Sequence, residues 1–369
     1  MNNTSDTSIT LVFWLLQNAN SICSCHHHPF SLSTITTTNP LRHVVWKIFW
    51  CLHQPIFMDF TRQYIKTHDA CPVMSIAFHP NLPLLATCSD NKTTIFYDIS
   101  TSPPTAKHHL EHHTDWVMSI AFHPSLPLFA TGSEDNSTIL YDISTLPPTI
   151  IYHLKHHTDW VRSVAFHPSF PLLATGSEDN STIIYDISTS PPTVKHHFKN
   201  YTESVLSVAF HPNLLLLATG SADNSIIMYY ISTSSPTVKH RFKHHTDWVW
   251  SVVFHLNLPL FATSSADNST IIYDISNIST SLPTIKYNFK HHTNPVRSIA
   301  FHPRFPLFAT GSYDTSTILY DISTAPPIIK HHLKKHTNWV FSVAFHPNLP
   351  LLATCSADNS TIMYNLDKM

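Results

Sequence analysis

Residues 157–188 read HTDWVRSVAFHPSFPLLATGSEDNSTIIYDIS, and versions of this stretch occur seven times in the chain of 369 residues. The stretch sets a period, because Phe166 has a counterpart in every copy. The steps are 44, 44, 44, 44, 47 and 44 residues, and they connect Phe78, Phe122, Phe166, Phe210, Phe254, Phe301 and Phe345. A fixed period in the forties is typical of repeat proteins, whose units are too small to bury an apolar face without their neighbours.

One copy predicts four short β-strands and no helix. β-branched and aromatic residues dominate residues 161–166, 172–177 and 182–187, and prolines or an Asp-Asn-Ser triplet separate them. These strands are apolar on both sides of the pleat, which indicates a sheet covered on both faces. Residues 193–199, TVKHHFK, are polar, as an exposed edge strand should be. The sequence therefore predicts an all-β fold, a seven-bladed β-propeller of four-stranded antiparallel blades.

The repeated residues resemble the WD-repeat family. The shared pattern is a histidine, V-x-S-V-x-F, a proline turn, L-A-T-G-S-x-D, and T-I-x-x-[WY]-D. The last pair is here Tyr-Asp at Tyr97-Asp98, Tyr141-Asp142, Tyr185-Asp186, Tyr273-Asp274 and Tyr320-Asp321. The resemblance covers residues 56–369, and it implies a propeller in which each sequence repeat begins after the outer strand of the preceding blade.

This offset leaves the seventh blade in need of an outer strand. Residues 60–66, FTRQYIK, resemble the outer strand TVKHHFK, and we expect them to close the ring by pairing with residues 361–366. Residues 1–55 carry no repeat, and we expect an N-terminal extension that is mostly disordered or loosely packed. Their apolar run at residues 9–16 is too short for a membrane span, which needs about 20 residues.

The resemblance also implies a buried, hydrogen-bonded set of four side chains in each blade, which we call the structural tetrad. It consists of a histidine, a threonine, an aspartate and an aromatic residue, here tyrosine instead of tryptophan. The complete tetrads are His113, Thr131, Asp135 and Tyr141; His157, Thr175, Asp179 and Tyr185; His245, Thr263, Asp267 and Tyr273; His292, Thr310, Asp314 and Tyr320; His336, Thr354, Asp358 and Tyr364. Asn91 replaces the aspartate of the first repeat and Tyr201 the histidine of the fourth. Those two blades would be weaker by about 1–3 kcal/mol if a buried partner were left unsatisfied. Because the set recurs, we interpret it as structural and not catalytic.

A candidate partner-binding face comes from positions beside the tetrads. In the family, partners most often dock on the face that carries the loops before the first strand and between the second and third strands. Trp, Tyr and Arg, the usual hot-spot residues of protein interfaces, are frequent there. The residues of this surface, which we call the aromatic face, are Trp116, Met118, Glu134, Trp160, Arg162, Glu178, Trp248, Trp250, Arg297, Tyr313, Trp339 and Phe341. The alternative is that these tryptophans pack between blades. Arg162, Trp250, Arg297 and Phe341 differ between copies and rank first as carriers of specificity.

Composition excludes several other functions. Charged residues make up 12% of the chain, with Lys+Arg 21 against Asp+Glu 23, so we expect no charge-driven binding of nucleic acid and no membrane span. The four glycines occupy equivalent strand positions and form no phosphate-binding loop. Cys23, Cys25 and His26–His28 could hold a soft metal ion, but no second ligand cluster of comparable spacing accompanies them, and we interpret them as chance residues of a disordered tail. We therefore expect neither a metal ion nor a cofactor. Asn-Ser-Thr triplets lie in tight turns where a glycan would crowd the blade, which favours an intracellular protein, cytoplasmic or nuclear.

The main functional hypothesis is a non-enzymatic scaffold that binds proteins or peptides within a larger complex. One alternative is a propeller enzyme with a site at the mouth of the channel, although the first strands offer Ser, Ala and apolar residues there. Another is a recently duplicated repeat protein with little selected binding, since the copies at residues 113–145 and 157–189 match at 28 of 33 positions.

Overall fold

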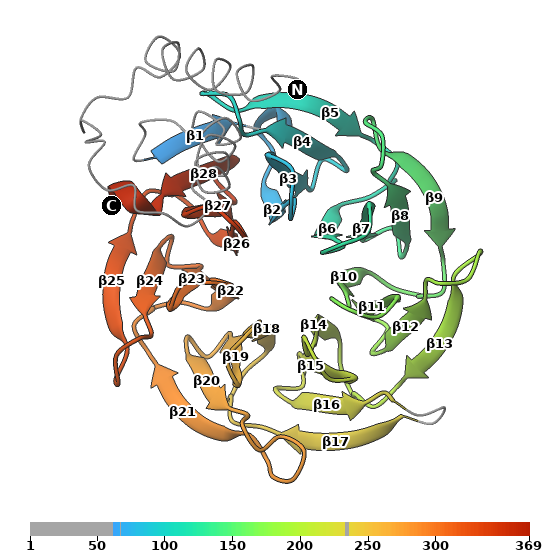
Figure 1. The fold of residues 1–369 in the computed structure, drawn as a ribbon, viewed down its shortest axis with the longest axis vertical. Helices are drawn as coiled ribbons and strands as arrows, with labels where there is room; N and C mark the ends of the chain where they lie inside the picture. The colour runs from blue at the N-terminus through green and yellow to red at the C-terminus, as the bar shows by residue number, and fades with distance from the viewer. Residues whose placement is uncertain (1–61, 67, 233–235) are drawn as a thin grey trace, which may run out of the picture. The chain divides into compact units, whose positions relative to one another are not determined.

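The computed structural model describes residues 62–66, 68–232 and 236–369. They form seven four-stranded antiparallel sheets that follow one another around a ring (Figure 1). The seven-bladed, all-β propeller predicted from the repeat is confirmed. The expected extension, residues 1–55, and its boundary at residue 56 lie outside the described residues, and this division of the chain stays a prediction.

Six blades are built from four strands in the order of the chain, from the centre of the ring outward, and the seventh takes its outer strand from the N-terminal end of the described chain. The inner strands are β2 (Val73–Phe78), β6 (Val117–Phe122), β10 (Val161–Phe166), β14 (Val205–Phe210), β18 (Val249–Phe254), β22 (Val296–Phe301) and β26 (Val340–Phe345). The second strands are β3 (Leu84–Ser89), β7 (Leu128–Ser133), β11 (Leu172–Ser177), β15 (Leu216–Ser221), β19 (Leu260–Ser265), β23 (Leu307–Ser312) and β27 (Leu351–Ser356). The third strands are β4 (Thr94–Asp98), β8 (Thr138–Asp142), β12 (Thr182–Asp186), β16 (Ile226–Tyr230), β20 (Thr270–Asp274), β24 (Thr317–Asp321) and β28 (Ser360–Asn365). The outer strands are β5 (Thr105–Leu110), β9 (Thr149–Leu154), β13 (Thr193–Phe198), β17 (Thr237–Phe242), β21 (Thr284–Phe289), β25 (Ile328–Leu333) and, in the seventh blade, β1 (Arg62–Lys66). Two short 3-10 turns are η2 (His68–Ala70) and η3 (Leu366–Lys368).

The seventh blade joins segments from both ends of the described chain. β1 pairs antiparallel with β28, with Arg62 opposite Tyr364 and Lys66 opposite Ser360. β28 in turn pairs with β27, so the strand order is β1-β28-β27-β26. The ring is thus closed by hydrogen bonds between strands that lie almost 300 residues apart in the sequence.

Burial follows the position of a strand in its blade. Every residue of β11 is buried, whereas the outer strand β13 exposes four of its six residues. The buried side chains form clusters between neighbouring blades, such as Ala130 and Leu140 of one blade against Val161 and Val164 of the next. Because each sheet is covered on both faces by its neighbours, its strands are apolar on both sides of the pleat.

A β-bulge interrupts the inner strand of every blade. In β10, Val161 lies opposite Ser177 and Ser163 opposite Gly176, so Arg162 is the extra residue without a ladder partner. The corresponding extra residues in the other blades include Trp250, Arg297 and Phe341. A bulge leaves one residue outside the ladder and redirects its side chain. This irregularity was not predicted from the sequence. It falls at the positions whose residue type differs most between the seven copies.

The four glycines of the second strands lie in close contact with the next blade, whereas Cys88, Ser264 and Cys355 occupy the equivalent position in the other three blades. A Cβ atom at Gly220 would lie 2.8 Å from Cγ1 of Val249 and 3.1 Å from its carbonyl oxygen. We expect Gly220→Ala to lower the free energy of unfolding by roughly 1–3 kcal/mol, because the blades would have to move apart. Urea denaturation followed by tryptophan fluorescence would measure this loss.

Ser264 gives a matched control for that substitution, because it occupies the equivalent position in the fifth blade and already carries a Cβ atom. Its hydroxyl is buried without a hydrogen-bond partner in the described part of the chain. Ser264→Ala should therefore be neutral or slightly stabilising. Equal losses for the two variants would contradict the explanation from close contact.

Candidate functional site

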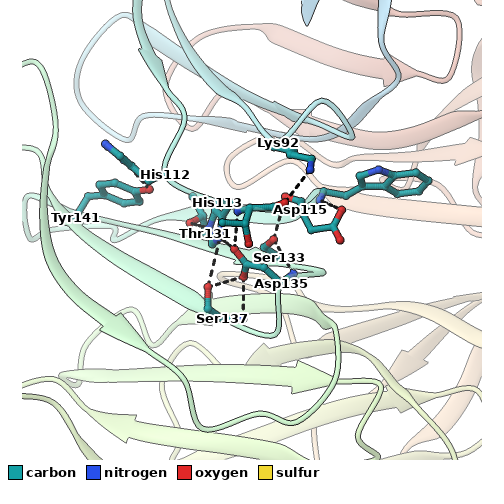
Figure 2. Close-up of polar contacts among 11 residues, drawn as sticks. Lys92, His112, His113, Asp115, Thr131, Ser133, Asp135, Ser137 and Tyr141 are labelled. Atoms are coloured by element: carbon teal, nitrogen blue, oxygen red, sulfur yellow. Dashed lines mark hydrogen bonds and ion pairs between the residues drawn. The ribbon is translucent and has the colours of Figure 1, made fainter.

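The structural tetrads hold the second and third strands of a blade against the loop that leads into the blade. In the second blade, His113 Nδ1 lies 2.8 Å from Asp135 Oδ2 and His113 Nε2 lies 2.6 Å from Thr131 Oγ1 (Figure 2). Equivalent contacts of 2.8–3.0 Å and 2.7–2.8 Å occur at His157, His245, His292 and His336. Burial opposes the charge of Asp135, but hydrogen bonds from His113 and Ser137 outweigh it and hold the pKa of that carboxyl well below its usual range.

The tyrosine of the tetrad makes a contact that the sequence analysis did not foresee. The hydroxyl of Tyr141 lies 3.3 Å from Nδ1 of His112, the residue before the tetrad histidine. The same contact measures 3.2 Å between Tyr273 and His244. Burial raises the pKa of the Tyr141 hydroxyl, so it stays protonated and can donate to the imidazole.

The two incomplete tetrads are hydrogen bonded by other means. In the first blade, Oδ1 of Asn91 accepts from the hydroxyl of Thr93 at 2.6 Å, and that hydroxyl lies 2.6 Å from Nδ1 of His68. In the fourth blade, the hydroxyl of Tyr201 donates to the carbonyl of Thr219 at 2.8 Å and accepts from the Ile227 amide at 3.1 Å. In the first blade no tetrad group is left unsatisfied, so the condition for the expected weakening is not met there. In the fourth blade the hydroxyl of the tetrad tyrosine, Tyr229, is buried without a hydrogen-bond partner in the described part of the chain, so the expected weakening still applies to this blade.

The positions assigned to the aromatic face are joined by backbone hydrogen bonds. The Glu178 amide donates to the carbonyl of Trp160 at 2.9 Å, and the Tyr313 amide donates to the carbonyl of Pro295 at the same distance. The bond ties the loop before the inner strand to the loop between the second and third strands. Equivalent bonds in the other blades place the corresponding residues on the same side of the ring.

Four tryptophans project from this side of the ring. The exposed fractions are 42% for Trp116, 36% for Trp160, 44% for Trp248 and 47% for Trp339. Their rings therefore do not lie buried between blades, which was the alternative reading of these residues. Met118, at 5% exposure, is a buried member of the predicted set, so it packs beneath the aromatic face and offers little area for contact with a partner.

Arg162 is neutralised by two glutamates. Its Nε donates to Glu178 Oε1 at 2.6 Å, and its Nη1 lies 3.4 Å from Glu134 Oε1. The guanidinium also lies 4.7 Å from the centre of the Trp160 ring, within the range of a cation–π contact. Burial raises the pKa of Glu134 to about 7, although the charge of Arg162 acts in the opposite direction.

The aromatic residues of the fifth to seventh blades form one continuous group, which we call the aromatic cluster. Trp250 meets Trp248 at 5.3 Å between ring centres, and it lies 6.4 Å from Tyr313. Tyr313 stacks on Trp339 at 4.6 Å, with an angle of 13° between the rings, and Phe341 lies 5.9 Å from Tyr313. These five side chains come from three blades, so the predicted residues meet only because the ring is closed.

A pocket of about 390 Å³ opens beside the aromatic cluster. Its lining includes Arg162, Glu178, Trp248 and Trp250. Leu206, the bulged residue of the fourth blade, also lines it. Six of its ten lining residues are polar or charged, so the pocket combines the two indole rings with hydrogen-bonding groups, and its volume suits a single side chain of a ligand.

The sequence analysis missed a second set of recurring histidines, at the end of each inner strand. They are His79, His123, His167, His211, His255, His302 and His346. In each of them Nδ1 accepts two backbone N–H groups of the following turn, as at His302 from Arg304 and Phe305, both at 3.0 Å. The signal was visible, because these histidines recur with the same steps as the neighbouring phenylalanines.

Residues 62–66, 68–232 and 236–369 contain neither a metal-ligand cluster nor a membrane-spanning helix. No three or more His, Cys, Asp or Glu side chains are grouped there so that they could hold a metal ion. The same residues include no helix with the length and apolarity that crossing a membrane requires.

Comparison with protein families matches the chain to the model described as "WD domain, G-beta repeat". The matched segments are residues 60–98, 104–142, 148–186, 192–229, 236–274, 283–321 and 328–365. Each matched segment begins at or near an outer strand and ends at a third strand, which is the offset between repeat and blade that the resemblance implied. A search of curated proteins found no match to the chain.

Proposed function

The chain belongs to the WD-repeat family, whose model matches well over half of its length, and we propose that it is a non-enzymatic scaffold that binds protein or peptide partners on its aromatic face. The observation that carries the proposal is the exposure of Trp116, Trp160, Trp248 and Trp339 on one side of the ring. Trp248 and Trp339 belong to the aromatic cluster, and a contiguous apolar patch usually marks a site of interaction. Tryptophan is also the residue type most enriched among interface hot spots.

The contrast between constant and variable positions of the repeat supports the same conclusion. Tetrad residues are the same in five copies, as the packing of a blade requires. The bulged residue of the inner strand instead varies from Arg162 to Leu206 to Trp250, although the backbone there is the same in each blade. A position whose side chain changes while its backbone is preserved can serve recognition without disturbing the fold.

Nothing in the geometry of this face favours an enzyme. The carboxylates nearest the inner strands, Glu134 and Glu178, are engaged by Arg162. Glu134 is also 8% exposed, which limits its access to a substrate. The scaffold is therefore the better interpretation of the site.

The test is a pull-down from cell extract with the protein and the double variant Trp248→Ala/Trp339→Ala, analysed by quantitative mass spectrometry. We expect the specific partners to fall at least about tenfold, because two exposed hot-spot side chains are removed. Their exposure makes the double variant compatible with an intact fold, which a thermal melt would verify.

Ile328→Ala is the matched control for this experiment. Ile328 is an exposed apolar residue, at 54%, but it begins the outer strand β25 and is not part of the aromatic face. The control should retain every partner. Partners that survive the double variant, or that depend on Ile328 to the same degree, would remove the assignment of the aromatic face.

A further inference from the structure

The two bulged arginines of the ring have different surroundings. Arg162 is neutralised by Glu178 of its own blade and Glu134 of the preceding blade. The residues at the corresponding positions around Arg297 are Tyr313 and Ala266, which carry no charge. Within the described ranges, no carboxylate lies within 4 Å of the Arg297 guanidinium. The repeat therefore contains its own comparison, an arginine with counterions and an arginine that lacks them.

Arg297 is held in place by aromatic rings. Its guanidinium lies 4.5 Å from the centre of the Trp250 ring, and Trp250 packs against Trp248. The side chain is half-buried, and burial lowers the pKa of its guanidinium. Tyr313, which hydrogen bonds to the guanidinium, acts in the opposite direction, and the charge of Arg162 adds to the effect of burial. A half-buried cation that lacks a counterion is a site of positive potential, and such sites attract anions.

We propose that the aromatic face recognises an acidic side chain of a peptide partner, whose Asp or Glu carboxylate pairs with Arg297 while a neighbouring apolar side chain enters the pocket beside Trp248 and Trp250. This inference rests on the proposed function and names the chemistry of the partner. Trp250 connects the two subsites, because one of its sides lines the pocket and its ring also stacks on the guanidinium. Arginine and a carboxylate form two parallel hydrogen bonds, which fixes the orientation of the ligand.

The charges around the site favour a carboxylate over a phosphate. Phosphate groups carry nearly two negative charges and are generally recognised by clusters of arginines. Here the second arginine, Arg162, already pairs with two glutamates. Glu203 also lines the pocket, so a doubly charged ligand would meet repulsion that a single carboxylate meets less strongly.

The experiment starts from a phage-displayed library of random 12-residue peptides, selected on the full chain. Selected peptides are resynthesised with a fluorescent label in three forms, with the acidic residue, with the corresponding amide and with phosphoserine at that position. Their dissociation constants are then measured by fluorescence anisotropy for the protein, Arg297→Met, Arg297→Lys and Trp248→Ala. Arg304→Met is the matched control, because Arg304 is exposed in the turn after the inner strand.

We expect acidic residues at one enriched position, and a loss of at least about tenfold on changing the acid to the amide. Arg297→Met should abolish the difference between acid and amide, Arg297→Lys should retain part of it, and Arg304→Met should keep it whole. A difference that persists in Arg297→Met would overturn the inference, as would a phosphoserine peptide that binds more tightly than the carboxylate.

The design separates the failure of this inference from the failure of the proposed function. Peptides that bind Trp248→Ala as tightly as the unchanged protein would refute the aromatic face as a binding site. Peptides that depend on Trp248 but not on Arg297 would refute only the carboxylate assignment. A selection that enriches no peptide would refute both.

Discussion

Acidification from pH 7 to pH 5 should unfold the propeller, because the histidines at the ends of the inner strands must stay uncharged in the folded state. Their Nδ1 atoms accept backbone N–H groups, as at His346 from Asn348 and Leu349, both at 3.0 Å. A protonated Nδ1 cannot accept, so protonation there would break the turn. Each ring also packs on a phenylalanine of the next blade, for example His302 on Phe345 at 5.0 Å between ring centres.

The direction of the pH dependence follows from the pKa values. Burial lowers the pKa of all seven histidines, and for His211, His302 and His346 to about 4, from an ordinary value of 6.5. Between pH 6.5 and pH 4 these histidines bind more protons in the unfolded chain than in the folded one, so their contribution to stability falls as the pH falls. Glu134, whose pKa burial raises to about 7, takes up its proton in the folded state over the same range and offsets about one of the seven histidines. The carboxyls of the tetrads do not contribute in this window, because their depressed pKa values act only below about pH 4.

The expected effect is large. At pH 5, each histidine with a pKa of about 4 reduces the free energy of unfolding by about 2 kcal/mol relative to pH 7. Three such groups together reach about 6 kcal/mol, which is comparable with the whole net stability of many domains. Urea denaturation at intervals of half a pH unit, followed by circular dichroism, would measure the loss. A free energy of unfolding that is constant from pH 7 to pH 5 would contradict this account.

Two substitutions distinguish the buried histidines from the many others. His302→Asn keeps an oxygen that can accept a turn N–H group but removes the titrating ring. We expect it to reduce the number of protons taken up on unfolding by about one. His109→Asn, at an exposed position of the outer strand β5, is the control for the loss of an imidazole ring. Equal effects of the two variants would show that burial at the inner strands is not the cause.

The repeat made most of the fold predictable. The predicted strands at residues 161–166 and 172–177 agree with β10 and β11 in the structure, because the turns between them are marked by proline and by Asp-Asn-Ser. The bulge at Arg162 was not predictable from alternation of side chains, which assumes a regular ladder. Regular alternation would place the two residues that flank Val117 on the same face with similar exposure. Because of the bulge, Trp116 is exposed and Met118 is buried.

The candidate site was predictable as a set of residues but not as a set of contacts. The stacking of Arg297 on Trp250 joins two blades, and the sequence does not show which side chains from neighbouring blades will meet. The pairing of Arg162 with Glu134 depends in the same way on the step from one blade to the next. The buried histidines were overlooked for another reason, since a His-Pro pair at a turn looks polar and exposed when it is read without its neighbours.

Removal of residues 1–67 should open the ring and make the protein aggregate. The deletion removes β1 and leaves the third strand β28 of the seventh blade as an edge with unpaired backbone groups. It also removes Ile65, which is buried in a cluster with Leu351 and Met363. Burial of an isoleucine contributes about 1.5–3 kcal/mol, and each lost strand hydrogen bond about 0.5–1.5 kcal/mol, so the loss amounts to several kcal/mol.

The outcome of this deletion depends on the edge strand as much as on the lost free energy. β28 lies in the apolar interior, with every residue from Thr361 to Asn365 buried, and an unprotected strand of this kind is a template for pairing with another chain. Size-exclusion chromatography with light scattering should show dimers or larger species for the deletion of residues 1–67. The matched control is deletion of residues 1–57, which keeps β1 and should leave the propeller stable and its oligomeric state unchanged. If the two truncated chains behave alike, closure by β1 is not what holds the seventh blade, and the stability of the ring must come from contacts between the inner strands of the first and seventh blades.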